Sequence, residues 1–280
     1  MSKATLGILV YLGITFVLAW VLWLIPMKMH IPPQSPSFQL AVAPGTFAPA
    51  VAAFIVRKWA TGEGFGDAGL RFALDRFPYY AFALLIPLVV VAAIMVLASA
   101  LGVSTPDFTL KRGLAVLRPS LVHQTTPPPL AVLVVNFLIS SVLLTPLYLG
   151  EEFGWRGYLQ IRLLADRPAL AAVATGLIWG VWHYPLVLLG YQYPDRPQLG
   201  LAVMPVSGVM LSIFFGWLQS ATGSVWTPSL AHSATNILGG SLVALLYMGG
   251  PNWIHVNYLG TLGWVPFGIL CAWILLTGRL

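Results

Sequence analysis

Long apolar stretches separated by short polar segments make up most of this chain. A helix that crosses a bilayer needs roughly 20 mostly apolar residues, and the chain contains eight stretches of this kind. They lie near residues 5–26, 38–56, 79–102, 130–150, 169–190, 201–221, 226–248 and 257–277. The stretch at 38–56 is the least regular because Pro44, Gly45 and Pro49 interrupt it. The pattern predicts an all-α, polytopic membrane protein with about eight transmembrane helices.

The composition also indicates a membrane protein. Of 280 residues, 58% are hydrophobic and only 8% are charged, whereas a soluble domain has about 25% charged residues. No linker or internal repeat divides the chain, so we expect a single integral membrane domain over residues 1–280. The first apolar stretch is too long for a signal peptide and lacks a cleavage site, which indicates an anchor. The one cysteine, Cys271, provides neither a disulfide framework nor a cysteine metal site.

The placement of basic residues predicts the orientation of the chain. With a cytoplasmic N-terminus, the predicted helices divide the 14 Lys and Arg residues into nine inside and five outside. The inner set is Lys3, Arg57, Lys58, Arg71, Arg76, Arg156, Arg162, Arg167 and Arg279, and the outer set is Lys28, Lys111, Arg112, Arg118 and Arg196. Because basic residues favour the cytoplasmic side, we predict cytoplasmic termini, in the plasma membrane if the cell is prokaryotic. The basic residues form no stripe, so their expected partner is the lipid bilayer and not nucleic acid.

Three charges stand at the end of the fourth apolar stretch, in Glu151-Glu152-Phe-Gly-Trp-Arg156. On a helix, Glu152 and Arg156 are four residues apart with the carboxylate first, which favours an ion pair. Glu151 points about 100° away from Glu152 around the helix and has no such partner. A carboxylate at this depth is unfavourable unless it is paired or functional, and an unpaired one suits a general base acting on water. Alternatively, both acids cap or pair structurally within the bundle.

Two further polar pairs recur at helical i,i+4 spacing. Trp179 and His183 are one turn apart, and Pro185 is expected to kink that helix. His232 and Asn236 share one helical face, where an imidazole and an amide can donate hydrogen bonds to a developing oxyanion. Each pair alone also fits a polar contact between helices. Together with the two adjacent acids, the pairs indicate one catalytic site.

Two other segments have a distinctive composition. The segment 157–168, which follows the acidic motif, alternates apolar and charged residues and predicts an amphipathic helix at the membrane interface. From Pro197 to Gly278 there is no Asp, Glu, Lys or Arg. Any chemistry in that part of the chain must use histidine, neutral polar or aromatic groups.

The polar residues form three motifs in a fixed order, Glu151-Glu152-x-x-x-Arg156, Trp179-x-x-x-His183 and His232-x-x-x-Asn236. This set resembles the CPBP family of intramembrane proteases, which includes CAAX prenyl endopeptidases and bacteriocin-processing or self-immunity proteins. Order and spacing match over about residues 130–245, the family-like catalytic core. Trp179 departs from the family, which usually has Phe there. The chain has no His-Glu-x-x-His zinc helix, and no signature of rhomboid-like or presenilin-like proteases.

The resemblance implies an endopeptidase with an eight-span helical core and an active-site cavity that opens to the cytosol. By position, Glu151 would activate water with help from His183. His232 and Asn236 would hold the oxyanion. The substrate would be a membrane-associated peptide or protein, with or without a prenyl group.

Three more motif residues, Glu152, Arg156 and Trp179, would orient the base or the substrate. The family has been described as metalloproteases, and two histidines with a glutamate could bind zinc. We favour no metal and no cofactor. Asparagine is a poor zinc ligand, and a glutamate base with an oxyanion hole accounts for every motif residue.

Two functions from other classes fit the same residues. A non-proteolytic immunity factor or scaffold would keep the pocket for binding alone. A small-molecule transporter could use the intramembrane charges, although we find no internal repeat of the kind common in transporters. The complete set of Glu151, His183 and His232 favours catalysis.

Overall fold

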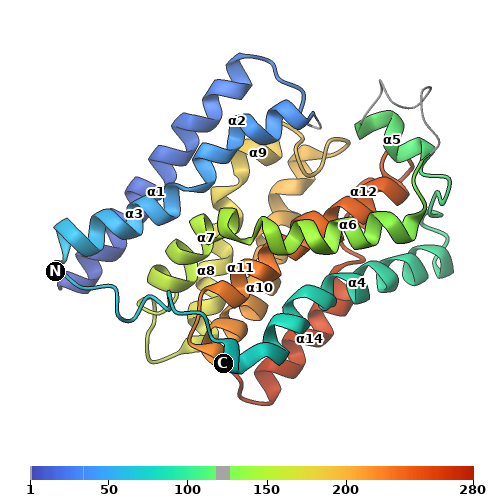
Figure 1. Cartoon of the computed structure of the whole chain (residues 1–280). Helices are drawn as coiled ribbons and strands as arrows, with labels where there is room; N and C mark the ends of the chain where they lie inside the picture. The colour runs from blue at the N-terminus through green and yellow to red at the C-terminus, as the bar shows by residue number, and fades with distance from the viewer. Residues whose placement is uncertain (1, 34, 118–126) are drawn as a thin grey trace.

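The computed structural model consists of helices and the turns that connect them (Figure 1), and it describes residues 2–33, 35–117 and 127–280. No strand occurs in these ranges. The predicted all-α class is therefore confirmed. Arg118, counted above among the outer basic residues, lies outside the described residues.

Five helices in the described ranges are long and apolar enough to cross a membrane. α1 (Lys3–Lys28) and α10 (Pro197–Thr222) are continuous, and α4 (Phe77–Ala100) follows the short turn η2 (Leu74–Arg76). The other two are composite. The first of these contains α2 (Pro36–Thr46), α3 (Ala48–Ile55) and the π-helix η1 (Val56–Ala60). The second contains α11 (Trp226–Ala234), the π-helix η5 (Thr235–Gly240) and α12 (Ser241–Tyr247).

A sixth candidate span is bent by 51° between α6 (Leu130–Leu143) and α7 (Thr145–Gly154), which continues into the π-helix η4 (Trp155–Leu159). Pro146 lies at the break and has no N–H to donate to the preceding turn. At the same break, the carbonyl of Ser141 accepts hydrogen bonds from the hydroxyls of Thr145, at 2.8 Å, and Ser233, at 2.7 Å. The second bond ties α6 to α11. The break therefore turns α7, which carries the two acids, into the bundle.

The predicted number of about eight spanning helices is not confirmed. α8 (Pro168–Trp182) and α14 (Trp264–Leu276) occupy two of the expected places, but both are shorter than a full span. Five helices, or six with the bent pair, satisfy the length and composition of a span among the described residues. The connections contain α5 (Lys111–Leu117), α9 (Tyr184–Leu188) and α13 (Trp253–Val256).

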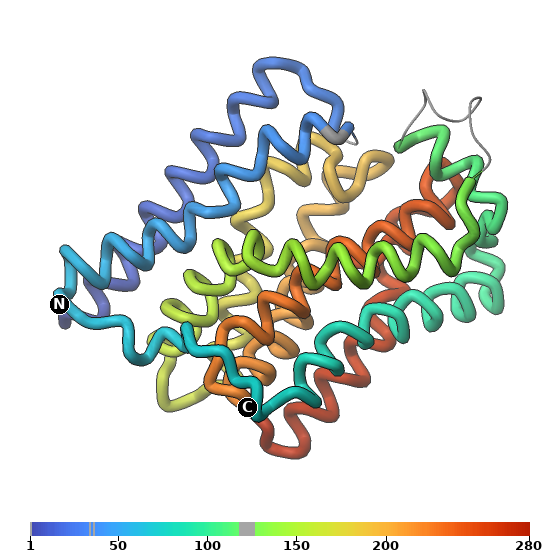
Figure 2. Tube along the Cα trace, viewed as in Figure 1, coloured from blue at the N-terminus to red at the C-terminus, as the bar shows by residue number. Residues whose placement is uncertain are grey.

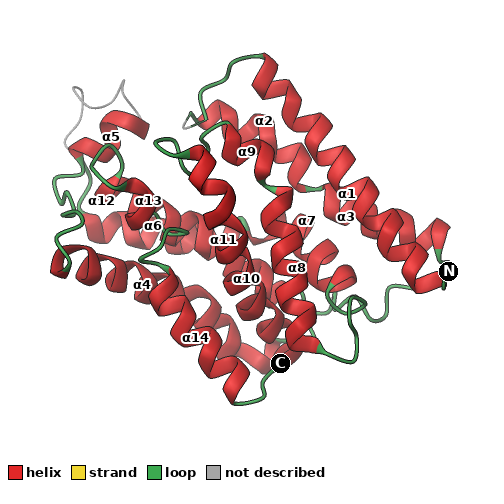
Figure 3. Cartoon of the chain, turned by 180° about the vertical axis from the view of Figure 1, so that it is seen from behind, coloured by secondary structure: helices red, strands yellow, loops and turns green. Residues whose placement is uncertain are grey.

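The helices form one bundle (Figures 1 and 2). α1 lies beside α2 and α3 on one flank, α4 and α14 lie on the opposite flank, and α7, α8, α10 and α11 fill the centre. The view from behind in Figure 3 agrees with Figure 1 that both termini lie at the same end of the bundle. α5, α12 and the start of α2 lie at the other end.

Four charged side chains among the described residues are buried in the bundle, while many large apolar side chains are exposed on its outer surface. Glu151, Glu152 and Arg156 are buried, whereas Val17, Val89, Ile139 and Ile269 are among the many exposed apolar residues. This is the distribution expected when lipid surrounds the outer surface and the ionisable groups face the bundle interior.

Small residues allow α8 and α10 to pack closely. A Cβ atom on Gly208 would lie 2.6 Å from the carbonyl oxygen of Gly176, and a Cβ on Gly180 would lie 2.4 Å from the Cα of Pro205. Both distances are shorter than real Cβ contacts, so only glycine fits at these positions. Close backbone approach at small residues is a common way for helices to associate in membranes. This contact fixes the position of Trp179, which neighbours Gly180.

A buried arginine joins the loop after the second span to the segment that follows α7. One terminal nitrogen of Arg57 donates to the carbonyl of Gly64 and to Asp67, both at 2.6 Å, and the other donates to the carbonyl of Gly157 at 2.7 Å. Partial burial raises the pKa of Asp67, but hydrogen bonds and charge from Arg57 and Arg162 outweigh it and lower the pKa below its usual value.

The amphipathic helix expected at 157–168 does not form. The π-helix ends at Leu159 and turns follow. Leu164 has φ +53°, a left-handed conformation that interrupts a right-handed helix. Arg162 instead reaches Glu63 at 2.9 Å and Asp67 at 2.8 Å. Arg162, one of the charges that suggested an interfacial helix, thus binds another loop of the protein.

Candidate active site

The three sequence motifs meet in the interior of the bundle, where α7, η4, α8 and α11 come together. Glu152 and Arg156 are fully buried, while Glu151, His183 and His232 are 5%, 9% and 3% exposed. The structure therefore separates two fully buried charged side chains from three side chains that remain slightly exposed to solvent.

The predicted ion pair of Glu152 and Arg156 is present. Glu152 Oε1 accepts from Arg156 at 3.0 Å and also lies 2.9 Å from His232 Nδ1. The guanidinium lies 4.7 Å from the centre of the Trp179 ring and 5.1 Å from that of Phe215. A cation between two aromatic faces gains electrostatic stabilisation in a poorly solvated place. Glu152 therefore has two basic partners and connects Arg156 to His232.

Glu151 is held by a different donor. Its Oε2 accepts a hydrogen bond of 2.8 Å from the indole Nε1 of Trp179. A phenylalanine, the usual residue of the resembled family, has no such donor. The departure noted in the sequence therefore adds a hydrogen bond to the proposed base.

The ring of His183 is oriented by a break in its own helix. Pro185 follows shortly after, α8 ends at Trp182, and the amide of His183 bonds to Gly180 instead of Trp179. The freed carbonyl of Trp179 lies 2.8 Å from His183 Nδ1. A carbonyl can only accept, so Nδ1 carries the hydrogen and the Nε2 of the neutral ring has a free lone pair. His183 is thereby set up to accept a proton, and Trp179 contacts both Glu151 and His183.

His232 faces Glu152 with the same ring nitrogen. Its Nδ1 donates to the carboxylate at 2.9 Å, so the Nε2 of the neutral ring is an acceptor. Only the protonated ring would donate through Nε2. The predicted oxyanion role of His232 therefore requires the imidazolium form.

Asn236 does not lie in the buried cluster with His232. The helix changes from α11 to the π-helix η5 between the two residues, and Asn236 is exposed. Tyr148 connects them, because its ring centre lies 4.8 Å from that of His232 and its side chain neighbours Asn236. Sequence reasoning missed Tyr148. The available signal was its position one helical turn before Glu151.

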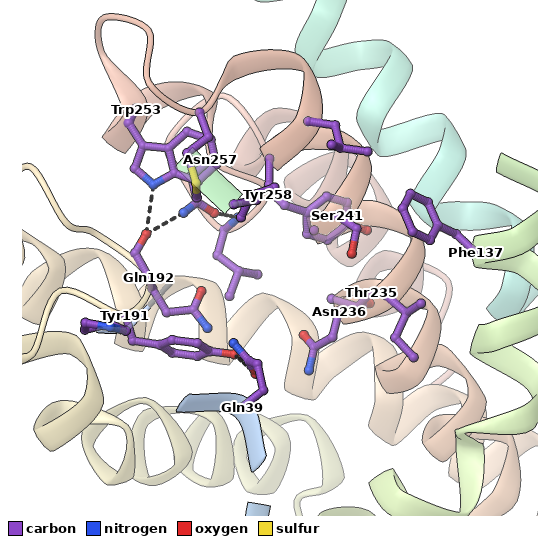
Figure 4. Close-up of a pocket in the computed structure, with 18 of the residues that line it drawn as sticks. Gln39, Phe137, Tyr191, Gln192, Thr235, Asn236, Ser241, Trp253, Asn257 and Tyr258 are labelled. Carbon is purple, nitrogen blue, oxygen red and sulfur yellow. Dashed lines mark hydrogen bonds between the residues drawn. The ribbon is translucent and has the colours of Figure 1, made fainter. Parts of the chain in front are cut away.

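A cavity of about 560 Å³ lies beside the site and is lined by Tyr148 and Asn236, but not by Glu151, His183 or His232. Figure 4 shows the wall that contains Asn236. Asn236 points into the cavity across from Gln39 and Tyr191, and the Tyr191 hydroxyl donates to Gln39 at 2.9 Å. The carbonyl of Gln192 accepts from Trp253 and Asn257 at the other wall. No lining residue is charged; the lining residues are Pro33, Gln39, Leu114, Leu117, Leu133, Phe137, Tyr148, Tyr191, Gln192, Thr235, Asn236, Ile237, Gly240, Ser241, Ala244, Leu245, Met248, Trp253, Asn257, Tyr258 and Leu259.

A second, wholly apolar groove of about 410 Å³ lies on another face of α7. Pro146, Leu149 and Phe153 of α7 line it, facing Phe47 and Phe54 of the second span. Gly150 allows this approach, because a Cβ there would lie 2.7 Å from the Phe47 ring. Two cavities thus flank the helix that carries both acids, one with polar groups in its wall and one wholly apolar.

The described residues do not gather as a metal site. No three His, Cys, Asp or Glu side chains among them are placed to hold one ion. Glu152, the acid nearest His232, already binds Arg156. The described residues therefore do not fit the zinc site considered from the resemblance.

The fold and the site together define a helical membrane protein with a carboxylate, histidine and indole cluster enclosed in its bundle. Residues 127–238 match the family described as Rce1-like, the type II CAAX prenyl endopeptidases. The matched segment contains all three motifs and overlaps most of the predicted core at 130–245, so the resemblance recognised from the motifs is confirmed over these residues. This is a protease family, which supports a hydrolase acting on a peptide or protein at the membrane. The comparison with curated proteins gives no match.

Proposed function

We propose that the protein is an intramembrane endopeptidase in which Glu151 activates water for hydrolysis of a peptide bond. The main support is the position of Trp179, whose indole fixes Glu151 and whose carbonyl fixes His183. Trp179 therefore positions both the proposed base, Glu151, and a second proton acceptor, His183. General-base catalysis requires such positioning before proton transfer.

The proposed reaction begins when Glu151 removes a proton from water and the water oxygen attacks the carbonyl carbon. The carbonyl electron pair moves to its oxygen, and the amide of Asn236 donates a hydrogen bond to that anion. His232 adds a second donor when protonated. The C–N bond then breaks, the leaving amine takes up the proton, and His183 assists this transfer. The ion pair of Glu152 and Arg156 takes no part in proton transfer and positions His232 through Glu152.

The apolar groove beside α7 supports a substrate that carries a hydrophobic chain. It is lined only by apolar side chains and lies on the helix that holds Glu151. We propose that it accommodates a lipid or prenyl group where the substrate has one. Cleavage of matched peptides with and without a prenyl group tests this directly. Equal kcat/KM for both peptides would contradict it.

The central experiment is cleavage of membrane-associated peptides by purified protein, compared with Glu151→Gln. The amide cannot take a proton from water, so activity should fall at least about 10²-fold, the low end for general-base catalysis. The variant should remain folded, because glutamine can still accept from Trp179. Activity close to that of the unchanged protein would contradict the assignment of the base.

Two further results would point to other functions or mechanisms. Peptide binding without cleavage by the unchanged protein would favour the scaffold or immunity function. Rapid inactivation by a zinc chelator, with recovery on zinc addition, would contradict the metal-free mechanism.

A further inference from the structure

One of the two hydrogen-bond donors assigned to the oxyanion, His232, donates only when its ring is protonated. A developing oxyanion is stabilised by groups that present a hydrogen to it. His232 uses its Nδ1 hydrogen for Glu152, and its other nitrogen donates only when the ring is protonated. Of the two residues assigned to the oxyanion, Asn236 is therefore the one that donates in either state of His232.

Tyr148 is placed to supply the missing hydrogen. Its half-buried ring lies 4.8 Å from the His232 ring, its side chain neighbours Asn236, and it lines the same cavity as Asn236. It is also three residues before Glu151 on α7, so both side chains belong to the same helix. A phenol hydroxyl carries its hydrogen at neutral pH whatever the state of His232.

We propose that Tyr148 is a further catalytic residue whose hydroxyl, together with the amide of Asn236, donates to the oxyanion. This inference rests on the proposed function. Tyr148 gains and loses no proton in the reaction. The new C–O bond, the broken C–N bond and the proton on Glu151 remain as described above. Its hydrogen bond forms as the carbonyl oxygen becomes negative and is released when the double bond reforms.

The test is Tyr148→Phe, which keeps the ring against His232 and removes only the hydroxyl. Losing one oxyanion donor typically lowers kcat by about 10²–10³-fold. We expect a loss of that size with KM little changed, because the bond strengthens only in the transition state. The loss should persist across the pH range in which the unchanged protein is active, since it does not depend on the charge of His232.

Tyr191→Phe is the matched control. Tyr191 lines the same cavity, but its hydroxyl already donates to Gln39. The kcat of this variant should therefore stay within about threefold of the unchanged value, a much smaller change than the loss of an oxyanion donor causes. Thermal unfolding in detergent checks that both variants are folded. A Tyr148→Phe protein with normal kcat, or with only a raised KM, would overturn the proposal. An equal loss of kcat in Tyr191→Phe would also overturn it.

An error in the role of Tyr148 can be distinguished from an error in the proposed function. If the unchanged protein cleaves no peptide, or Glu151→Gln cleaves normally, the protease mechanism itself is wrong. If the unchanged protein is active, Glu151→Gln is inactive and Tyr148→Phe is normal, only the role of Tyr148 is wrong.

Discussion

At the scale of single residues, Trp179 has a larger role than the motif pattern indicates. The sequence places it one turn before His183 and identifies it as a departure from the usual Phe. The structure shows that its indole donates to Glu151, its carbonyl accepts from His183, and its ring lies under Arg156. One residue thus contacts three of the charged or titratable groups in the site.

We predict that Trp179→Phe lowers kcat by about tenfold with KM little changed. Hydrogen bonds to charged groups contribute roughly 1.5–3 kcal/mol, and part of this should remain because Phe keeps an aromatic face for Arg156. Steady-state cleavage of one membrane peptide by both proteins measures the effect.

The matched control is Trp182→Phe. The indole of Trp182 donates to the carbonyl of Thr15 at 3.3 Å and not to a motif acid, so this variant should lose stability more than turnover. A Trp179→Phe protein as active as the unchanged one would mean that Glu151 needs no donor from position 179.

At the scale of elements, breaks in helices place the functional groups. Pro146 bends the chain before the acids, and the helix break near Pro185 frees the carbonyl that orients His183. π-helical segments follow both Glu152 and His232, and such segments often occur at functional sites. The continuous spans expected at 130–150 and 169–190 are therefore each divided at the point where chemistry is proposed.

We predict that Gly208→Ala destabilises the protein by about 1–3 kcal/mol, the usual range for overpacking. The added methyl would meet the Gly176 carbonyl of α8 and push the two helices apart. Thermal or chemical unfolding in detergent measures the change. Because α8 also carries Trp179, activity should fall with stability.

Gly268→Ala provides the comparison for that variant. Gly268 lies in α14, and a Cβ there would meet no atom within 4 Å. Alanine favours a helix over glycine by about 1 kcal/mol, so this variant should be unchanged or slightly more stable. Equal behaviour of the two variants would show that the α8–α10 contact is looser than described.

At the scale of the whole molecule, both termini lie at one end of the bundle (Figures 1 and 3), and the large cavity lies at the other. The cavity is lined at that end by residues of α2, α5, α12 and α13, and it extends toward the centre along α6, α7 and η5. The charge pattern predicts cytoplasmic termini, whereas the family resemblance implies a cavity open to the cytosol. Because the termini and this cavity lie at opposite ends of the bundle, they cannot both face the cytosol.

We predict, from the positive-inside rule, that the termini are cytoplasmic and that the cavity opens on the outer side. Single cysteines at Lys3, Lys111 and Thr277, each in a Cys271→Ser background, allow a test with a membrane-impermeant thiol reagent on intact cells. All three positions are exposed. Only the cysteine at position 111 should react before the membrane is opened.

The opposite labelling pattern would contradict the charge-based orientation. Reaction at positions 3 and 277, with protection at 111, would place the termini outside and turn the cavity to the cytosol, as the resemblance implies. Cleavage activity of each cysteine variant confirms that the labelled protein is folded.

The sequence by itself determined the features that depend on local spacing. Apolar runs were sufficient to predict an all-α membrane protein, because a bilayer requires the backbone of each span to satisfy its own hydrogen bonds. The i,i+4 spacing of Glu152 and Arg156 was sufficient to predict their ion pair, since a single helical turn brings them together. Three ordered motifs were sufficient to recognise the family over residues 127–238.

Only the tertiary structure decided how distant segments meet. His232 is 80 residues from Glu152, and Trp179 is 28 residues from Glu151, so no periodicity relates them. Their contacts depend on close helix packing at glycines and on the bend at Pro146. The hydrogen on His232 Nδ1 and the position of Tyr148 beside His232 follow from that packing. A local pattern carries no information about these features because they depend on which helices become neighbours.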